Sequence, residues 1–153
     1  MELAVVSLEP APDGVHTGQV DTGQLSRVRD RLAGADWNAV VAEPAQMLPA
    51  TQLAHHLVAE TVVAARIDLE QLIADHPGKR LVVLCAAEPL RDLVSAVLDV
   101  PAAAVPLPQP FSLTRLRASR SGARSLLCLN DTLHLIDSDA DERVNRGGSL
   151  VCD

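Results

Sequence analysis

The chain has 153 residues, enough for one domain with a buried core, and its formal net charge is −7 at pH 7. This balance disfavours a nucleic-acid partner, because phosphate binding needs a clustered positive face. No apolar run approaches the roughly 20 residues that cross a bilayer. The N-terminus also lacks the basic flank and long apolar core of a signal peptide, so we expect a cytoplasmic protein with no membrane partner.

The core must be assembled from small aliphatic side chains. Hydrophobic residues make up 48% of the chain, but it contains one Trp, one Phe and no Tyr. Ala, Val and Leu pack well between helices and a sheet. The cysteines Cys85, Cys128 and Cys152 are odd in number and widely spaced, which indicates neither a disulfide framework nor a zinc site. We therefore predict no metal and no other cofactor.

Apolar runs and helical periodicity alternate along the first hundred residues. Short apolar runs predict strands at 3–6, 38–42, 61–68 and 80–87. Capped or amphipathic segments predict helices at 22–34, 44–60, 69–79 and 88–100. Within the second of these helices, Pro49 marks either a kink or the true first turn.

The next segment predicts a β-hairpin. Runs at 111–118 and 124–130 flank the turn sequence "SRSGA". A hairpin that closes alternating strands and helices makes the sheet mixed, so we predict a three-layer α/β/α sandwich with a mostly parallel sheet. Residues 1–136 would form a single domain, and the polar stretch 137–153 a flexible tail.

Basic residues are densest around this hairpin, at Arg115, Arg117, Arg120 and Arg124. Charge runs usually face water, so we interpret them as a solvated strand face rather than an anion-binding site. His55 and His56 are adjacent on a predicted helix and point about 100° apart, which excludes a bidentate metal site. His134 lies in the closing segment, where we expect a structural hydrogen bond.

Four segments in chain order carry a pattern of framework residues. They are "LAVV" before Ser7, "EPAQMLPATQLA" at 43–54, "VVLCAAEPLR" at 82–91, and the hairpin that closes on "NDTLHL" at 130–135. This succession resembles the histidine phosphatase superfamily, which has the phosphoglycerate mutase-like fold, over nearly all of residues 2–136. The resemblance implies the same α/β fold for this chain.

The resemblance also implies that the family's chemistry has been lost. Family members attack phosphorus with a histidine, and two arginines and a second histidine hold the phosphoryl oxygens. In those positions this chain has Ser7, Leu8, Met47 and Ala86. None of them supplies a histidine nucleophile or a positive donor, so the chain resembles a degenerate member with no phosphatase or mutase activity.

The resemblance further implies a truncated lid. Family members carry a substantial insertion before the strand of the second histidine, and it often supplies the general acid. Here that region is reduced to about 67–80, in which Glu70 alone stands near the place of the acid. A Glu in the first turn of a helix is adequately explained by the helix dipole and solvent.

Two hypotheses from different classes remain. In the first, the chain is a catalytically inactive phosphatase-like domain that acts as a binding or regulatory module for a protein or a small molecule. In the second, it is an enzyme that re-uses the cleft for different chemistry on a small molecule. Besides Ser7, the candidate cleft residues are Glu9, His16, Cys85, Glu88 and Arg91. They show no spacing typical of a catalytic triad, and we expect Cys85 to be a buried, inert thiol. A homodimer through the hairpin edge or the Ala-rich helices is a further expectation.

Overall fold

The fold is that of a computed structural model, which describes residues 1–8 and 22–136. These residues contain a six-stranded sheet in the order β3-β2-β4-β1-β5-β6. The strands are β1 (Glu2–Leu8), β2 (Ala39–Ala42), β3 (Glu60–Val63), β4 (Arg80–Ala86), β5 (Leu113–Ala118) and β6 (Arg124–Asp131). The first four strands are parallel, and β5 is antiparallel to both of its neighbours, β1 and β6. The predicted mixed sheet is confirmed.

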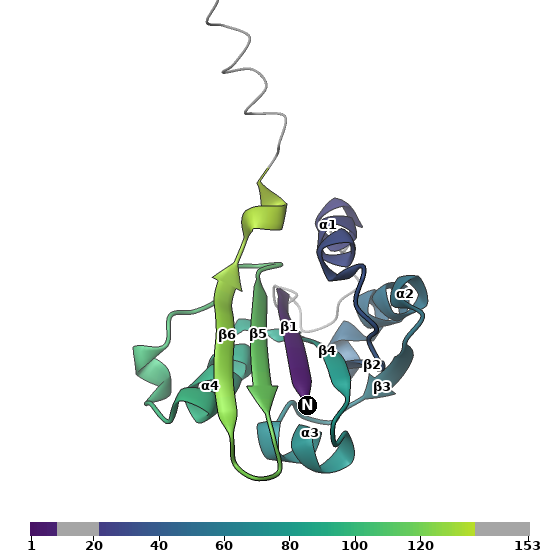
Figure 1. Cartoon of the computed structure of the whole chain (residues 1–153). Helices are drawn as coiled ribbons and strands as arrows, with labels where there is room; N and C mark the ends of the chain where they lie inside the picture. The colour runs from purple at the N-terminus through teal and green to yellow at the C-terminus, as the bar shows by residue number, and fades with distance from the viewer. Residues whose placement is uncertain (9–21, 137–153) are drawn as a thin grey trace, which may run out of the picture.

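Helices cover both faces of this sheet (Figure 1). They are α1 (Thr22–Leu32), α2 (Met47–Leu57), α3 (Leu69–Asp75) and α4 (Ala87–Leu98), with short 3-10 turns at Pro44–Gln46, Ala102–Ala104 and Leu133–Leu135. Helices α1 and α2 share one apolar cluster with one face of the sheet, and α3 and α4 share a second cluster with the other face. This is the predicted three-layer α/β/α sandwich.

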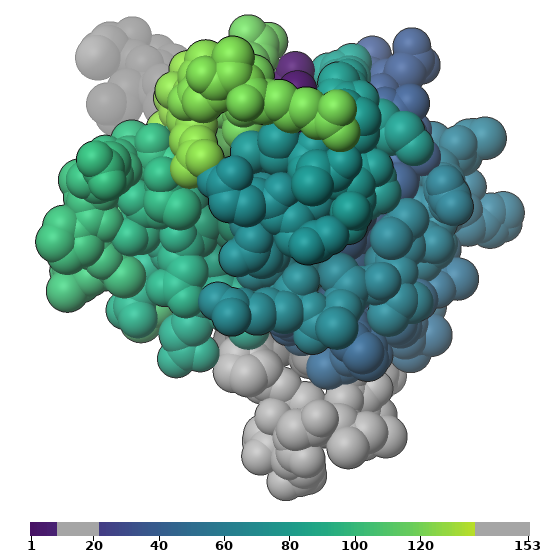
Figure 2. All heavy atoms as spheres, turned by 90° about the horizontal axis from the view of Figure 1, so that it is seen from below, coloured from purple at the N-terminus to yellow at the C-terminus, as the bar shows by residue number. Residues whose placement is uncertain are grey.

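The lower end of the sheet is open to the surface. Seen from below, the first residues of the chain, in purple, reach the surface beside the yellow-green hairpin turn (Figure 2). At this end β1 and β4 begin side by side, with Glu2 opposite Arg80. The carboxyl-terminal ends of both strands therefore meet at the opposite edge.

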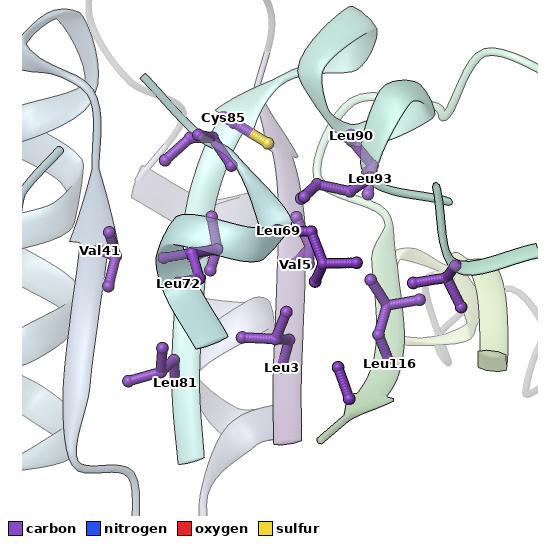
Figure 3. Packing of buried hydrophobic residues seen from close by; sticks show 14 of the residues in the cluster. Leu3, Val5, Val41, Leu69, Leu72, Leu81, Cys85, Leu90, Leu93 and Leu116 are labelled. Atoms are coloured by element: carbon purple, nitrogen blue, oxygen red, sulfur yellow. The ribbon is translucent and has the colours of Figure 1, made fainter. Parts of the chain in front are cut away.

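The core explains why the central strands are apolar throughout. Alternate side chains of a strand point to opposite faces, and a strand that is covered on both faces needs apolar residues at every position. In β1, Leu3 and Val5 pack with α3 and α4 (Figure 3), whereas Ala4 and Val6 pack with α1 and α2. All four side chains are fully buried.

Helix α4 confirms the clearest helical pattern in the sequence. Its buried residues are Leu90, Leu93, Val94 and Val97, which have the i, i+3, i+4, i+7 spacing of one helix face. They pack on β1, β4 and β5 in the cluster that also contains Cys85. Because α4 follows β4 without an intervening loop, it begins at the edge of the sheet where β4 ends.

Two predicted boundaries were wrong. The segment 44–60 divides into a 3-10 turn and α2, and Pro49 lies in the first turn of α2, where no intrahelical N–H bond is required. The third strand ends at Val63 rather than near 68. Its partner β2 ends at Ala42, opposite Val63, so there is no strand beside which β3 can continue.

Two arginines of α1 form hydrogen bonds with the end of β6 and with the 3-10 turn that follows it. Arg31 Nη2 donates to Asp131 Oδ2 at 3.2 Å, and Arg27 Nη1 donates to the Leu135 carbonyl at 2.9 Å. The Leu133 N–H also donates to Asp131 Oδ1 at 3.0 Å. This backbone hydrogen bond, followed by the Arg31 guanidinium, lowers the pKa of Asp131 below its ordinary value of 3.8.

Replacing Asp131 with Asn should reduce the free energy of unfolding by about 1 kcal/mol at pH 7, because it removes charge-assisted hydrogen bonds in a partly exposed setting. Since the folded-state pKa is lowered, this stabilisation is present above pH 4 and is lost as the pH falls through the lowered pKa. Urea unfolding at several pH values measures both effects. The exposed Asp36→Asn variant is the control, and an equal loss at pH 7 and pH 2.5 would contradict the assignment.

The closing segment also braces the end of β1. His134 Nε2 lies 3.0 Å from the Phe111 carbonyl, and the Phe111 N–H donates to the Ser7 carbonyl at 2.7 Å. The expected structural hydrogen bond of His134 is thus present.

Within the described part of the chain, none of the helices combines the length and apolarity that crossing a membrane requires.

Candidate functional site

The carboxyl-terminal edge of the parallel strands is where open α/β sheets bind their ligands. Strand register places Ser7 opposite Cys85 and Leu8 opposite Ala86 at this edge. Met47 is the first residue of α2, which follows β2 after one 3-10 turn. Three of the four positions that the sequence aligned with the family's catalytic residues therefore lie on adjacent strand ends, and the fourth begins the neighbouring helix.

Of these four side chains, Leu8 belongs to the hydrophobic core and Met47 is partly buried against it. Leu8 is 4% exposed and lies in the cluster under α1 and α2, and Met47 packs against the same cluster. A side chain that is buried among aliphatic groups can neither attack phosphorus nor pair with an oxyanion. At Leu8 and Met47 this edge therefore carries apolar side chains that pack on the cluster under α1 and α2.

Ser7 is held within the sheet. Its N–H donates to the Ser112 carbonyl at 3.2 Å, and its carbonyl accepts the Phe111 N–H. The residue is 1% exposed. The end of β1 is thus bonded to the segment that leads into β5, and Ser7 is not presented to solvent.

Cys85 is fully buried in the cluster under α3 and α4. Burial raises the pKa of its thiol well above the ordinary value, and the negative charge of Glu43 raises it further. A reactive cysteine needs the opposite, a nearby cation that favours the thiolate. Cys85 is therefore a neutral, inert thiol, as expected, whereas Cys128 is only partly buried.

The remaining candidate residues do not form a catalytic group. Glu88 is exposed in the first turn of α4. Arg91 is partly buried, and its Nε has no hydrogen-bond acceptor among the described residues. Glu9 and His16 lie outside the described residues.

Metal ligands are not grouped in the part of the chain that the structure describes. His55 and His56 are exposed on α2, and their rings stack with centroids 5.8 Å apart. Residues 1–8 and 22–136 contain no group of three His, Cys, Asp or Glu side chains that could hold a metal ion. A zinc or iron site needs such a group.

A cavity of about 670 Å³ lies between α3 and α4 beside this edge. Its carboxylates come from Glu43, Asp68, Glu70, Glu88 and Asp92, and its one basic side chain is Arg66. Three of the carboxylates have structural partners: Glu43 Oε1 accepts the Ile67 N–H at 3.4 Å, Asp68 caps α3 through the Gln71 N–H, and Glu70 pairs with Arg124. This cavity therefore has a negative lining, to which Ser7, Leu8, Met47 and Ala86 do not contribute.

Sequence reasoning missed several of these edge residues. Glu43 was detectable, because it is the first charged residue after the strand 38–42. Gln46 and Ser112 are buried at 4% and 0% exposure, and Gln46 Oε1 and Ser112 Oγ have no hydrogen-bond partner among the described residues. No sequence pattern marked these two, since their burial depends on how β2 and β5 meet the edge.

Comparisons with known proteins agree on the architecture. No family model and no curated protein sequence matches the chain. Among solved structures, YhfR of Bacillus stearothermophilus superposes with a TM-score of 0.73 at 10% identity, over 88% of this chain and 99% of that one. Phosphoglycerate mutase from Plasmodium falciparum superposes with a TM-score of 0.58 at 10% identity, over 84% and 89%. The chain has the phosphoglycerate mutase-like fold.

Other proteins with this fold carry phosphatase names. A mutant phosphoserine phosphatase from Entamoeba histolytica, in complex with phosphoserine, matches with a TM-score of 0.67 at 10% identity, over 88% of this chain and 99% of that one. At such identities the likeness concerns the phosphoglycerate mutase-like fold alone. What this fold does here depends on the residues at its edge.

Proposed function

We propose that this chain is a catalytically inactive phosphatase-like domain that acts as a binding or regulatory module. The observation that carries the proposal is the burial of Leu8 in the hydrophobic core, with Met47 packed against the same cluster, on the edge where a phosphatase of this fold would hold a phosphoryl group. Ser7 and Ala86, which share that edge, add no positive donor.

The charge of the edge supports the same proposal. Phosphoryl transfer depends on preorganised cations around a group that stays negative throughout. Here the neighbouring cavity is lined by more carboxylates than basic groups. The negative charge of Glu43 also raises the pKa of the Cys85 thiol. A phosphomonoester would be repelled from this cavity rather than held there.

The hypothesis of a re-used cleft has less support. Its two described candidate nucleophiles are Ser7, which is buried, and Cys85, whose thiol stays neutral. A nucleophile needs an adjacent base or a lowered pKa, and neither accompanies these groups among the described residues.

A phosphatase assay tests the proposal. With p-nitrophenyl phosphate and phosphoserine as substrates and the unmutated phosphoserine phosphatase of Entamoeba histolytica as the reference, phosphate release should be at least about 10⁵-fold slower than for the reference, because nucleophile and oxyanion donors are lost together. Ser7→Ala and Glu88→Gln are the matched variants. If both release phosphate at the same residual rate as the unmodified chain, a contaminant is the source of that rate. Turnover that follows the purified protein and falls in either variant, or a labelled phosphohistidine, would overturn the proposal.

A further inference from the structure

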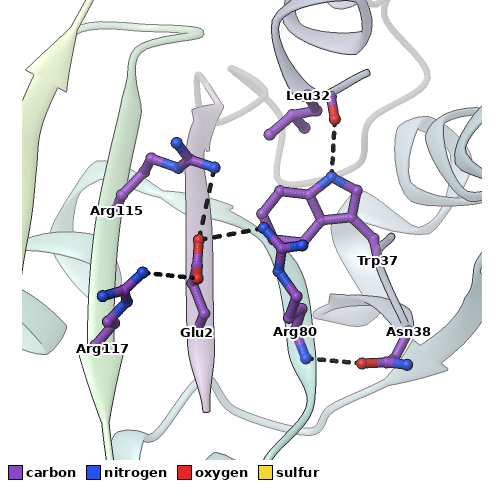
Figure 4. Close-up of polar contacts among 7 residues, drawn as sticks. All are labelled: Glu2, Leu32, Trp37, Asn38, Arg80, Arg115 and Arg117. Atoms are coloured by element: carbon purple, nitrogen blue, oxygen red, sulfur yellow. Dashed lines mark hydrogen bonds and ion pairs between the residues drawn. The ribbon is translucent and has the colours of Figure 1, made fainter. Parts of the chain in front are cut away.

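Three arginines converge on one carboxylate at the opposite end of the sheet from the candidate site (Figure 4). Arg80 Nη2 lies 3.5 Å from Glu2 Oε1, and Arg115 Nη2 lies 3.6 Å from the same oxygen. Arg117 Nη2 lies 3.5 Å from Glu2 Oε2. Register produces this cluster, because Arg80 on β4 and Arg117 on β5 both stand directly opposite Glu2.

The cluster has more positive charge than Glu2 can neutralise. Within residues 1–8 and 22–136, three guanidiniums around one carboxylate leave two uncompensated charges, in a chain whose net charge is −7. The N···O distances of 3.5 to 3.6 Å exceed the roughly 2.7–2.9 Å of a well-formed charge-assisted hydrogen bond. In addition, the Nε atoms of Arg80 and Arg115 are buried without an acceptor among the described residues. The three arginines therefore share one carboxylate, and some of their N–H groups have no acceptor among the described residues.

Neighbouring residues hold part of the cluster in place. The Arg80 guanidinium lies over the Trp37 ring, 5.1 Å from its centroid, and the Trp37 Nε1–H donates to the Leu32 carbonyl at 2.9 Å. The Arg80 N–H donates to Asn38 Oδ1 at 2.8 Å. A guanidinium that is already oriented loses little conformational entropy when it binds an anion.

The cluster is accessible on a face of the sheet that the helices leave partly open. Among the described elements, α1 meets the hairpin near Leu113 of β5 and Asp131 of β6, and no helix lies in front of the other end of β5 and β6 (Figure 1). The side chains of Arg80 and Arg115 are each 37% exposed, and that of Arg117 is 63% exposed. A small anion can therefore reach all three.

The other two arginines of the hairpin are engaged elsewhere. Arg120 donates to the Ala74 carbonyl at 2.9 Å, and Arg124 pairs with Glu70. The basic stretch that the sequence suggested was a single solvated face is thus divided, since Arg115 and Arg117 join Arg80 on the opposite side. Arg120 provides a control position in the same hairpin.

From this geometry we infer that Arg80, Arg115 and Arg117 form a binding site for a phosphate group. Two uncompensated charges match a phosphate dianion, and planar guanidinium groups fit its oxygens. The site is separate from the proposed function, because Glu2 begins the strand whose other end, at Leu8, reaches the candidate edge. Phosphate would be bound at this end of the sheet and not hydrolysed there.

Titration with inorganic phosphate at constant ionic strength tests the inference. Trp37, the only tryptophan, reports through its fluorescence, and the Nε–H resonances of Arg80 and Arg115 report by NMR. We expect saturable changes in both, and about tenfold weaker binding in Arg115→Ala and in Arg117→Ala, since each removes a charge-assisted contact. Glu2→Gln should bind phosphate more tightly, because it removes the competing carboxylate.

Matched variants and a second ligand complete the test. Arg120→Ala should bind phosphate like the unmodified chain. If circular dichroism shows that an alanine variant does not fold, Arg115→Lys and Arg117→Lys replace it. These variants keep the positive charge but lose the planar guanidinium with its paired N–H donors, so they should still weaken phosphate binding. Phosphoserine distinguishes the source: equal affinity indicates the phosphate group alone, and higher affinity indicates a phosphomonoester. Absence of saturation, equal responses to chloride, or equal affinity in all arginine variants would overturn the inference.

Discussion

Replacing Trp37 with alanine should lower the free energy of unfolding by about 3–5 kcal/mol, the usual cost of deleting a buried aromatic side chain. Trp37 is 4% exposed and packs in the cluster under α1 and α2. Its Nε1–H is bonded to the Leu32 carbonyl at the end of α1, and its ring supports Arg80 on β4. The substitution would leave a cavity where α1, β2 and β4 meet.

The Trp37→Phe variant separates packing from hydrogen bonding. It keeps most of the apolar volume and loses the bond to the Leu32 carbonyl, so the expected loss is smaller than for alanine, on the order of 1–2 kcal/mol. Urea unfolding followed by circular dichroism measures both variants. If alanine cost no more than phenylalanine, the ring would not be the structural contact described above.

Replacing Leu90 with alanine should cost about 2–5 kcal/mol, because the side chain is fully buried between α4 and the sheet. Leu98 lies on the same helix at 43% exposure, so Leu98→Ala is the matched control, with an expected loss under about 1 kcal/mol. Urea unfolding measures both.

Alkylation of Cys85 gives a second readout at the candidate edge. Cys85 shares the cluster of Leu90, and its burial keeps the thiol neutral. Loosening α4 should therefore speed the reaction of Cys85 with iodoacetamide in Leu90→Ala but not in Leu98→Ala. Equal labelling in the two variants would mean that α4 does not seal this edge.

The fold could be predicted largely because its signals are local. The apolar strand 80–86 and the spacing of Leu90, Leu93 and Val94 each depend on neighbours only a few residues away. The alternation of such segments restricts the architecture to helices on both faces of a sheet. The boundaries that failed, at β3 and α2, depended on the length of β2 and on the position of Pro49 within a turn.

The candidate site could be located from the sequence but not described. The resemblance to the histidine phosphatase superfamily placed Leu8 at the position of the histidine nucleophile, and the strand ends indicated the edge. They did not reveal that Leu8 and Met47 pack on the same apolar cluster, or that the charge of Glu43 raises the pKa of Cys85, because these interactions join separate strands and helices.

By itself, then, the sequence determined the order of elements and the apolar faces, both of which follow from composition and short-range periodicity. Only the tertiary structure decided which charged groups meet. Glu2 and Arg80 are far apart in the chain and become neighbours because β1 pairs with β4, and Arg117 joins them because β5 pairs with β1. Strand order and register are properties of the whole sheet, so a local pattern carries no record of them.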